Sequence, residues 1–353
     1  MTAGPHHTRP TSSAPGLSRR GFLGGAVAVG VLSPLLAACS SSGGAGTTSS
    51  GTSGGDHRTV RLGWSTSLLS GTAKSRGVFA KTLAAKGIEV KWVGPFPNHA
   101  PSIQAVIGNS ADLSFGGSST VALAAIEAGG DLKLASLSST NIRTSSVLVL
   151  PKSGITSVRD LVGKKIAVNK SGLGQFIATA ALQKYGVPLD KVSFVYLDPG
   201  DAGPAFYSGK VDAWSMFGDT VQVAEAKYGA VPIFTDSKEL SAQLDYTTFV
   251  TRADYAQDNG DVLEAVFAAY QAEQKWTNAH FFESVDANAR TEKLDAKTVA
   301  LIKKQEKGTV TTLDAPFTRA DVQKLQTSAD WMTKNKVLPK SIDVSKYALT
   351  SFA

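Results

Sequence analysis

Cysteine, histidine and nucleotide-binding motifs are scarce in this 353-residue chain. A single cysteine, Cys39, excludes an intrachain disulfide and a zinc site built from CxxC pairs. The five histidines occur without an HExxH string, and neither GxxxxGK[ST] nor GxGxxG is present, so zinc-protease and nucleotide sites are not indicated. With few candidate bases, we expect a protein that is not an enzyme and holds no metal or other cofactor.

Charged residues are absent from Gly21 to Ala38, a run of 18 residues that directly follows Arg19 and Arg20. A basic segment, an apolar run and small residues before a cleavage point together form an export signal. The run contains four glycines and Pro34, so it is a poor permanent transmembrane helix. The string SRRGFL matches the twin-arginine signal, which implies export of a folded protein.

Cys39 ends the string LAAC, where the apolar run meets a tract of serine and glycine. This string resembles the lipobox of bacterial lipoproteins, and the resemblance implies cleavage before Cys39 and a lipid on its thiol. The alternative is a plain secretory signal followed by a chance cysteine. We therefore interpret residues 1–38 as a twin-arginine lipoprotein signal peptide. The protein is then expected on the outer face of the cell membrane, anchored through Cys39.

The segment 39–57 is expected to be a flexible tether, because residues 40–55 are Ser, Gly, Thr and one Ala without a charge. Removal of residues 1–38 takes away three arginines and no acid, which changes the formal net charge from +7 to +4. A charge this small gives no reason to expect nucleic-acid binding, and it is compatible with a small anionic ligand.

Short apolar strands and amphipathic helices alternate from residue 58 onward. Strands are expected at 60–63, 88–93, 111–115, 132–136, 146–150, 165–168, 192–197, 211–217 and 248–250. Helices are expected at 73–85, 102–107, 121–128, 158–161, 175–185, 203–207, 261–276, 296–304 and 318–334. This alternation with short loops predicts an α/β fold with parallel sheets.

Two crossings of the chain, near residues 150 and 249, divide the folded part. Residues 58–150 are expected to form the first part of lobe 1, and residues 151–248 are expected to form lobe 2. Residues 249–353 then return to lobe 1 and end in helices. Two such lobes would leave a ligand cleft between them.

Three strand-to-helix junctions are rich in serine, threonine and glycine: Ser65–Ser67, Gly117–Thr120 and Ser171–Gly174. A helix N-terminus presents unpaired N–H groups and a partial positive charge, so it stabilises an oxyanion placed there. Hydroxyl side chains add further donors. Any one junction alone is also explained by ordinary N-capping. Three junctions at the carboxyl ends of strands that face one cleft indicate a ligand site.

Other candidate residues have two interpretations each. Trp214, with Phe217 near it, offers an apolar wall for an organic tail or packs in the core of its strand. Asp219 accepts a hydrogen bond from a ligand amine or caps the helix that follows it. Arg143 pairs with an anion at the mouth of the cleft or lies exposed on the surface.

Four strings resemble the aliphatic sulfonate, taurine and nitrate solute-binding proteins of ABC importers, with the closest resemblance to the sulfonate branch. They are VFAKTLAAKGIEVKWV (78–93), VLPKSGITSVRDLVGKKIAVNKSG (149–172), SGKVDAW (208–214) and ADWMTKNKVLPKSIDV (329–344). The resemblance extends over about residues 61–344 and implies a two-lobed type II periplasmic-binding fold that closes over a small sulfonate. The implied partners are an alkanesulfonate-like anion and an ABC permease, with the protein a monomer.

The resemblance also implies that hydroxyl and main-chain N–H groups hold the anion. Transferred by position, the implied ligand-binding residues are Ser65, Thr66, Gly117, Ser118, Ser119, Thr120, Ser171, Gly172, Gln175 and Trp214. The chain departs from the family pattern after Lys170, where it reads SGLGQ, and after Met216, where it reads FGDT. These departures leave the solute open among sulfonates, taurine, nitrate and a thiamin-pyrimidine-like compound. An exported lipid-anchored enzyme on the same scaffold is the alternative from another class.

Overall fold

The computed structural model describes residues 58–66 and 69–352, together with Met1. Apart from Met1, the predicted signal peptide (1–38) and the predicted tether (39–57) lie outside the described residues, and so does Cys39. Within the described part of the chain, no helix combines the length and the apolar character needed to cross a membrane.

The sheet that contains the first strand has both parallel and antiparallel pairs. Strands β1 (Arg58–Gly63) and β2 (Ile88–Val93) pair in parallel, and strands β4 (Leu132–Leu134) and β12 (Val250–Arg252) pair antiparallel. Leu113 joins the two pairs, because it bridges Leu62 in parallel and Thr251 antiparallel. The expected strand 111–115 is thus reduced to a single bridge at Leu113. The prediction of purely parallel sheets is wrong here, since β12 returns from the other half of the molecule and needs no crossover helix.

A second, antiparallel sheet lies where the chain passes between the two halves of the molecule. Its strand order is β13-β5-β11-β3. The four strands are β3 (Gly117–Ser118), β5 (Leu137–Thr140), β11 (Thr247–Thr248) and β13 (Thr311–Asp314). The strands β3 and β11 have two residues each, and β5 and β13 are rich in Ser and Thr. The alternation pattern therefore did not predict β5 and β13.

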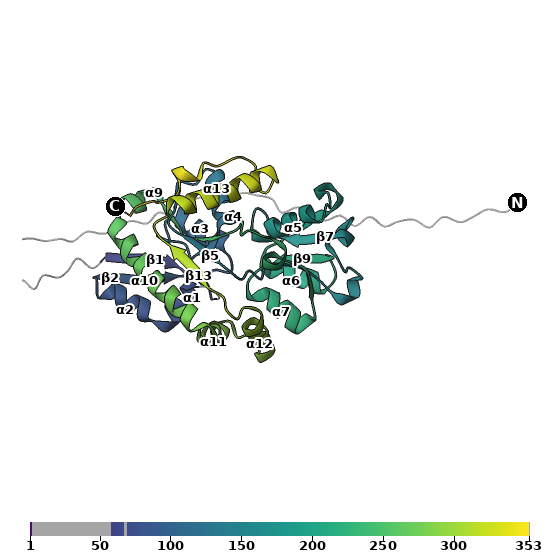
Figure 1. Cartoon of the computed structure of the whole chain (residues 1–353), viewed down its shortest axis with the longest axis horizontal. Coiled ribbons are helices and arrows are strands. Elements are labelled where there is room, and N and C mark those ends of the chain that lie inside the picture. Colours follow the sequence, from purple (N-terminus) through teal and green to yellow (C-terminus); the bar gives the residue numbers. More distant parts are fainter. Residues whose placement is uncertain (2–57, 67–68, 353) are drawn as a thin grey trace, which may run out of the picture. The chain divides into compact units, whose positions relative to one another are not determined.

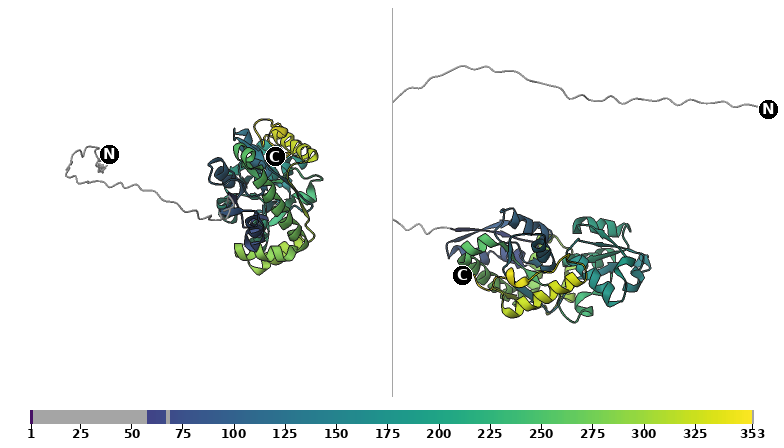
Figure 2. Two further views of the ribbon diagram at one scale, coloured as in Figure 1. Left: turned by 90° about the vertical axis from the view of Figure 1, so that its left-hand side faces the viewer. Right: turned by 90° about the horizontal axis from the view of Figure 1, so that it is seen from above.

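The third sheet has the order β10-β6-β9-β7-β8 and forms the other half. Its strands are β6 (Ser146–Val149), β7 (Lys165–Val168), β8 (Ser193–Tyr196), β9 (Ala213–Met216) and β10 (Val231–Thr235). The strand β7 is parallel to β8 and β9, as predicted, whereas β6 runs antiparallel to β9 and β10. We call residues 146–235 the second lobe and the other described residues from 58 onward the first lobe. Figure 1 and the right-hand view in Figure 2 show the teal second lobe at one end of the part formed by the described residues from 58 onward.

Helices cover these sheets. Up to residue 239 they are α1 (Leu69–Arg76), α2 (Val78–Ala84), α3 (His99–Ile107), α4 (Ser119–Glu127), α5 (Leu173–Lys184), α6 (Pro199–Tyr207), α7 (Asp219–Tyr228) and α8 (Asp236–Glu239). They continue with α9 (Ala253–Asp258), α10 (Gly260–Ala279), α11 (Phe281–Glu292), α12 (Ala296–Gln305) and α13 (Arg319–Lys334).

Two helical predictions differ from the structure for local reasons. The single helix expected at 73–85 is divided into α1 and α2 at Gly77, whose φ of 70° ends the first helix. The turn at Val158–Leu161 is a 3-10 helix closed by a Ser157–Asp160 capping box. The predicted helices near 261–276, 296–304 and 318–334 are present as α10, α12 and α13.

The two lobes contact each other on both flanks. On one flank, Gln305 of α12 donates to Glu225 of α7 at 2.6 Å. On the other, the ring of Trp331 in α13 meets that of Phe176 in α5 edge-on, with centroids 4.9 Å apart. These contacts leave the space between the flanks for a cleft.

Candidate functional site

A cavity of about 510 Å³, which we call the first cavity, lies at the lobe boundary. It lies where several helices begin. Its lining includes Ser65 and Thr66 before α1, Asn98 and His99 at α3, Gly117 and Ser118 at α4, Asn169 and Leu173 at α5, Pro199 at α6, and Gly218, Asp219 and Thr220 at α7. The first three helices belong to the first lobe and the last three to the second. A small ligand in this cavity would therefore contact both lobes.

The junction before α1 brings Ser65 and Thr66 to the cavity. Ser65 is buried, and its backbone N–H donates to the Ser70 hydroxyl at 3.1 Å. The Thr66 hydroxyl donates to Glu292 of α11 at 2.9 Å. The third predicted member of this junction, Ser67, lies outside the described residues. Ser65 and Thr66 thus both line the cavity, and one hydrogen-bond donor of each already binds an acceptor within the chain.

The junction at the start of α4 is occupied by a carboxylate of the same chain. Asp245 Oδ1 accepts from the hydroxyls of Ser118 at 2.7 Å, Ser119 at 3.2 Å and Thr120 at 2.8 Å. It also accepts from the backbone N–H of Thr120 at 3.0 Å. Burial nevertheless raises the pKa of Asp245. Ser119 and Thr120 are fully buried and do not line the cavity, so this part of the predicted site is an internal hydrogen-bond network.

Gly117 allows a close approach of His99. A Cβ atom on Gly117 would lie 2.4 Å from the ring carbon Cγ of His99, so no larger residue fits there without displacing the ring. His99 is 3% exposed, and its ring nitrogens lie 3.0 Å from the Ser118 carbonyl oxygen and the Ser114 hydroxyl. Burial lowers the pKa of His99 to about 4, so the ring is neutral at physiological pH.

The junction before α5 also uses its donors internally. The backbone N–H of Ser171, at a φ of 49°, donates to Gln175 Oε1 at 2.7 Å. The N–H of Gly174 donates to Asn169 Oδ1 at 2.8 Å. The cavity is lined here by Asn169 and Leu173, and not by the predicted Ser171, Gly172 or Gln175.

Trp214 and Arg143 lie away from the cavity lining. Trp214 is 2% exposed and packs against Phe206, with ring centroids 5.7 Å apart. It therefore packs in the core of its lobe and does not form a wall of the cavity. Phe217 lines the first cavity in its place. Arg143 forms an ion pair with Asp236, Nε to Oδ1 at 3.0 Å. Its charge is therefore neutralised within the chain.

The start of α7 presents free donors to the first cavity. Gly218 precedes the helix with a φ of 62°, which favours glycine. Within residues 58–66 and 69–352, no group accepts from the backbone N–H groups of Asp219 and Thr220. This is the helix start at which an oxyanion would find unpaired N–H groups.

Asp219 itself is half-buried at the boundary between two cavities. Its carboxyl has a pKa raised to about 8, first by burial and then by the nearby charges of Glu292 and Glu306. The carboxyl is thus mostly protonated at neutral pH when no ligand is bound.

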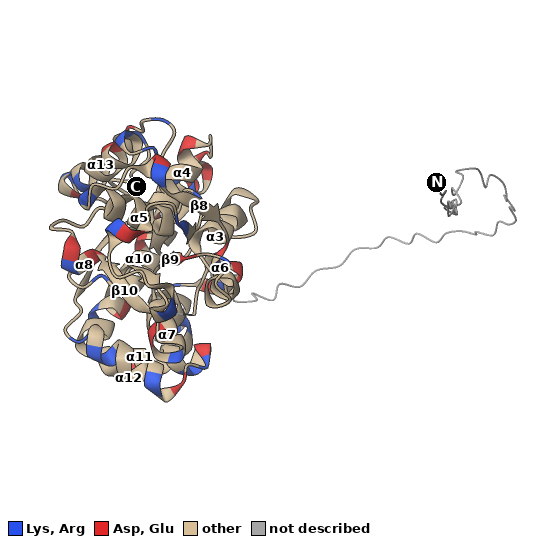
Figure 3. Cartoon of the chain, turned by 90° about the vertical axis from the view of Figure 1, so that its right-hand side faces the viewer, with Lys and Arg blue, Asp and Glu red and all other residues tan. Residues whose placement is uncertain are grey.

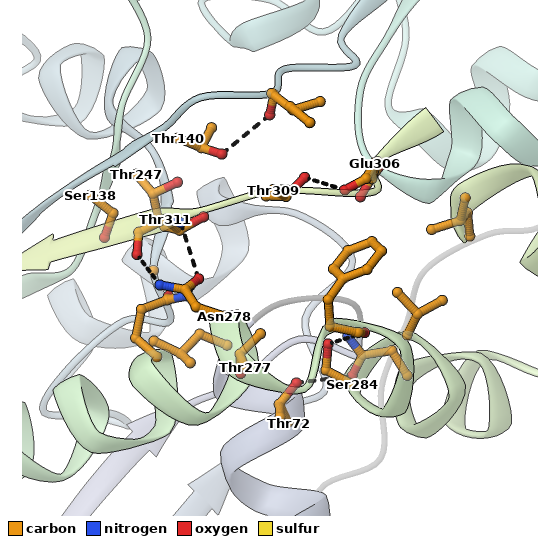
Figure 4. Close-up of a pocket in the computed structure, with 18 of the residues that line it drawn as sticks. Thr72, Ser138, Thr140, Thr247, Thr277, Asn278, Ser284, Glu306, Thr309 and Thr311 are labelled. Atoms are coloured by element: carbon orange, nitrogen blue, oxygen red, sulfur yellow. Dashed lines mark hydrogen bonds between the residues drawn. The ribbon is translucent and has the colours of Figure 1, made fainter. Parts of the chain in front are cut away.

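A second cavity, of about 270 Å³, shares Asp219 and Thr247 with the first. Figure 4 shows its polar lining. The residues come from α1, α10, α11, the end of α12 and strands β5 and β13, and they include Thr72, Ser138, Thr140, Thr277, Asn278, Ser284, Glu306, Thr309 and Thr311. Apolar side chains close it at Leu69, Ile142, Phe281, Val285 and Ile302.

The described lining of the two cavities contains acidic residues but no Lys or Arg. Asp219, Asp245, Glu292 and Glu306 line one or both cavities, and none of the described lining residues is Lys or Arg. Elsewhere along the described chain, Figure 3 shows acidic and basic residues interspersed, for example on α7 and α11. The site is therefore uncharged or negative, and any anion must be held by neutral donors.

Comparison with known proteins shows the family to which the chain belongs. The sequence matches the family described as NMT1/THI5 like over residues 71–280, more than half of the chain. The chain belongs to the NMT1/THI5-like family. The resemblance inferred from the four strings is thereby confirmed, because relatives of this NMT1/THI5-like protein are named as sulfonate-binding proteins.

A putative aliphatic sulfonates-binding protein of Bacillus subtilis (strain 168) is 28% identical to this NMT1/THI5-like protein over 322 residues, 90% of this chain and 92% of the relative. The alkanesulfonate-binding protein SsuA from Xanthomonas axonopodis pv. citri, solved with bound MOPS, has a TM-score of 0.74 at 22% identity, covering 82% of this chain and 98% of that one. The desulfurization enzyme DszB has a TM-score of 0.60 at 15% identity, covering 84% and 97%. These structures confirm the predicted periplasmic-binding fold.

Several lining residues escaped the sequence analysis. Asn98 caps α3 by accepting from the N–H of Ala100 at 3.1 Å, and its position before a helical stretch was a usable signal. Asp245, Glu292 and Glu306 gave no local signal, because they reach the cavities from segments far along the chain.

Proposed function

We propose that this NMT1/THI5-like protein is the solute-binding component of an ABC importer and that its solute is a small organosulfonate. The observation that carries the proposal is the convergence of six helix starts from both lobes on one cavity. The names of the relatives support the choice of a sulfonate.

The unpaired N–H groups of Asp219 and Thr220 are the proposed primary contact for the sulfonate oxygens. Ser65 and Thr66 from the first lobe, with Asn98 beside them, supply further neutral donors across the cavity. Gly117 and Ser118 contribute the wall next to His99. The other predicted site residues support these groups from behind and do not touch the solute in this proposal.

Binding would act on the relation between the lobes. A ligand that contacts both lobes at once favours the arrangement in which both sets of contacts exist, and it shifts the population toward that state. An importer would then distinguish loaded from empty protein by lobe arrangement.

Export and anchoring complete the proposal. A twin-arginine signal (1–38) would carry the folded protein across the membrane, and a lipid on Cys39 would hold it at the outer face. The tether (39–57) would let the folded part (58–353) move about 20 Å root-mean-square from the anchor. The protein would work as a monomer with an ABC permease, without nucleic acid.

Other functions differ from this one in measurable ways. Nitrate, taurine or a thiamin-pyrimidine-like solute would use the same cleft. An enzyme on the same fold is a real alternative, because DszB shares the fold at 15% identity. A binding protein returns its ligand unchanged, whereas an enzyme would convert it.

Titration calorimetry on the full chain, purified in detergent, tests the proposal. The panel comprises two- to four-carbon alkanesulfonates, taurine, nitrate and an aminopyrimidine, with mass spectrometry of the recovered ligand. We expect heat with at least one sulfonate, an unchanged ligand and a higher melting temperature, since about 100-fold excess over Kd stabilises by about 2.7 kcal/mol. Absence of binding by every sulfonate would contradict the proposed solute.

A further inference from the structure

Carboxyl groups from both lobes meet beside the start of α7. Asp219 belongs to the second lobe and lines both cavities. Three acids of the first lobe share these cavities with it: Asp245 and Glu292 line the first cavity, and Glu306 lines the second. The one histidine in the described lining, His99, has a pKa lowered to about 4 by burial, so its ring is uncharged at neutral pH. The described lining thus holds several acids and no positive charge.

The cations of the elements that pack near α7 are engaged elsewhere. Lys297 of α12 donates to the carbonyl oxygen of Ala226 at 2.7 Å, near the far end of α7. Lys303, also in α12, pairs with Asp286 at 2.6 Å. Arg143 is held in the ion pair described above. Among the described groups none neutralises the carboxyl at the start of α7, so a proton is the remaining way to do so.

An anion at this helix start would lie beside that carboxyl. The N–H groups of Asp219 and Thr220 are the proposed contact for the sulfonate oxygens, and the Asp219 carboxyl belongs to the same helical turn. Two unit negative charges about 4 Å apart in such a partly dry site repel strongly enough to lower affinity about a thousandfold. A protonated carboxyl removes this repulsion, and its O–H group is a further donor for a sulfonate oxygen.

The ligand-free protein already favours the protonated form. Burial first, and then the nearby charges of Glu292 and Glu306, raise the pKa of Asp219 to about 8. A bound anion adds another negative charge beside the carboxyl and raises this pKa further. Below pH 8 most molecules therefore hold the proton before the anion arrives. Above pH 8 the proton must be taken up on binding, so affinity falls as pH rises.

We infer that Asp219 holds a proton whenever the anion is bound, and that it selects singly charged anions over doubly charged ones. This inference rests on the proposed function, because the anion is the sulfonate group at the start of α7. A sulfonate carries one negative charge throughout the neutral range. A phosphonate of the same chain length gains a second charge as pH rises, as phosphate esters do. Its dianion would need a second proton before it could bind beside these acids.

Titration calorimetry with propane-1-sulfonate from pH 6 to pH 9 tests the inference on the full chain in detergent. The ligand does not titrate in this range, so any change of affinity with pH belongs to the protein. We expect a Kd that is nearly constant from pH 6 to pH 7 and about tenfold higher at pH 9. Titrations at pH 8 in buffers of different ionisation enthalpy should show uptake of about half a proton per sulfonate bound.

Three variants assign the proton. Asp219→Asn should abolish the proton uptake and the loss of affinity between pH 6 and pH 9. Glu306→Gln removes a neighbouring acid and should keep the proton uptake, with its midpoint at lower pH. Glu264→Gln is the matched control and should behave as the wild type, because Glu264 is exposed on α10 and lines neither cavity.

Propane-1-phosphonate is the matched ligand for the selection of charge. At pH 9, where it is a dianion, it should bind at least about 100-fold more weakly than propane-1-sulfonate, because its second charge adds to the repulsion by the carboxyls. At pH 6, where most of it carries one charge, the difference should be much smaller.

The outcomes separate this inference from the proposed function. Sulfonate affinity that is independent of pH, with no proton uptake, overturns the inference and leaves the sulfonate function standing. Proton uptake that survives Asp219→Asn assigns the proton to another group and also overturns it. Equal binding of the phosphonate and the sulfonate at pH 9 overturns the selection of charge. Failure of every two- to four-carbon sulfonate to bind at any of these pH values overturns the proposed function and, with it, the inference. If Asp219→Asn does not fold, the pH series and the buffer series on the wild type still decide.

Discussion

The starts of α4 and α7 face the same cavity but differ in what fills them. At α4, Asp245 accepts four hydrogen bonds from Ser118, Ser119 and Thr120. At α7, the N–H groups of Asp219 and Thr220 have no acceptor among the described residues. Both starts carry small or hydroxyl residues, so local sequence does not distinguish them. A helix start becomes a candidate ligand site only where no distant segment supplies the acceptor.

The largest effect is expected when a carboxylate is placed at the start of α7 and compared with one placed beside the start of α5. Thr220→Asp puts a carboxylate at the start of α7, where about 4 kcal/mol of repulsion against a bound sulfonate is expected at close range. Sulfonate affinity should fall about a thousandfold. Ser171→Asp makes the same change beside the start of α5, at a residue that does not itself line the cavity, and should change the affinity less than about threefold by this account. Calorimetry on both variants measures the difference, and equal losses would contradict it.

Removing Asp245, the acceptor at the start of α4, tests the comparison by its effect on the stability of the fold. Asp245→Ala leaves the buried donors of Ser119 and Thr120 without a partner, and we expect the free energy of unfolding in urea to fall by about 3 kcal/mol. Asp258→Ala, at an exposed position in α9, is the control and should be neutral. An unchanged unfolding midpoint for Asp245→Ala would show that the network does not stabilise the fold.

The close approach at Gly117 predicts a smaller effect. Gly117→Ala places a methyl group against the His99 ring, at 2.4 Å before relaxation, and should destabilise the protein by about 2 kcal/mol. Gly200→Ala is the control, because a Cβ atom there meets nothing within 4 Å. Thermal unfolding of the two variants should differ in melting temperature; equal values would remove the steric role of Gly117.

Asp219 predicts an effect on stability whose size depends on pH. Its folded pKa of about 8 lies above its usual value of 3.8, so the folded ligand-free state binds the proton more tightly than the unfolded state. Stability from this group is present below pH 3.8 and is lost as pH rises toward 8. Asp219→Asn should therefore match the wild type near pH 4 and be more stable than the wild type at pH 8. Urea unfolding at the two pH values checks this; equal pH dependence for both proteins would contradict it.

Periodicity and turn residues predicted much of the fold. The alternation of strands and helices gave β1, β2, β7 and the long helices α10 and α13 close to their observed positions. Strand direction was beyond this method, since β6 and β12 are antiparallel through pairing with segments distant in sequence. The strands β5 and β13 escaped because their residues are mostly Ser and Thr.

The candidate site was predicted less completely, for a physical reason. Ser65, Thr66, Gly117, Ser118 and Asp219 do line the cavities. Ser171, Gly172 and Gln175 follow the same local pattern, yet Asn169 and Gln175 use the donors of that junction. Which donors remain free depends on acceptors that fold in from elsewhere, and a local motif carries no information about them.

The most direct test of the account is a crystal structure of the protein with a three-carbon alkanesulfonate bound. The account predicts sulfonate oxygens about 3 Å from the N–H groups of Asp219 and Thr220, with Asp245 still bonded to the start of α4. Sulfonate oxygens found at the start of α4 in place of Asp245, or outside the cleft, would contradict it.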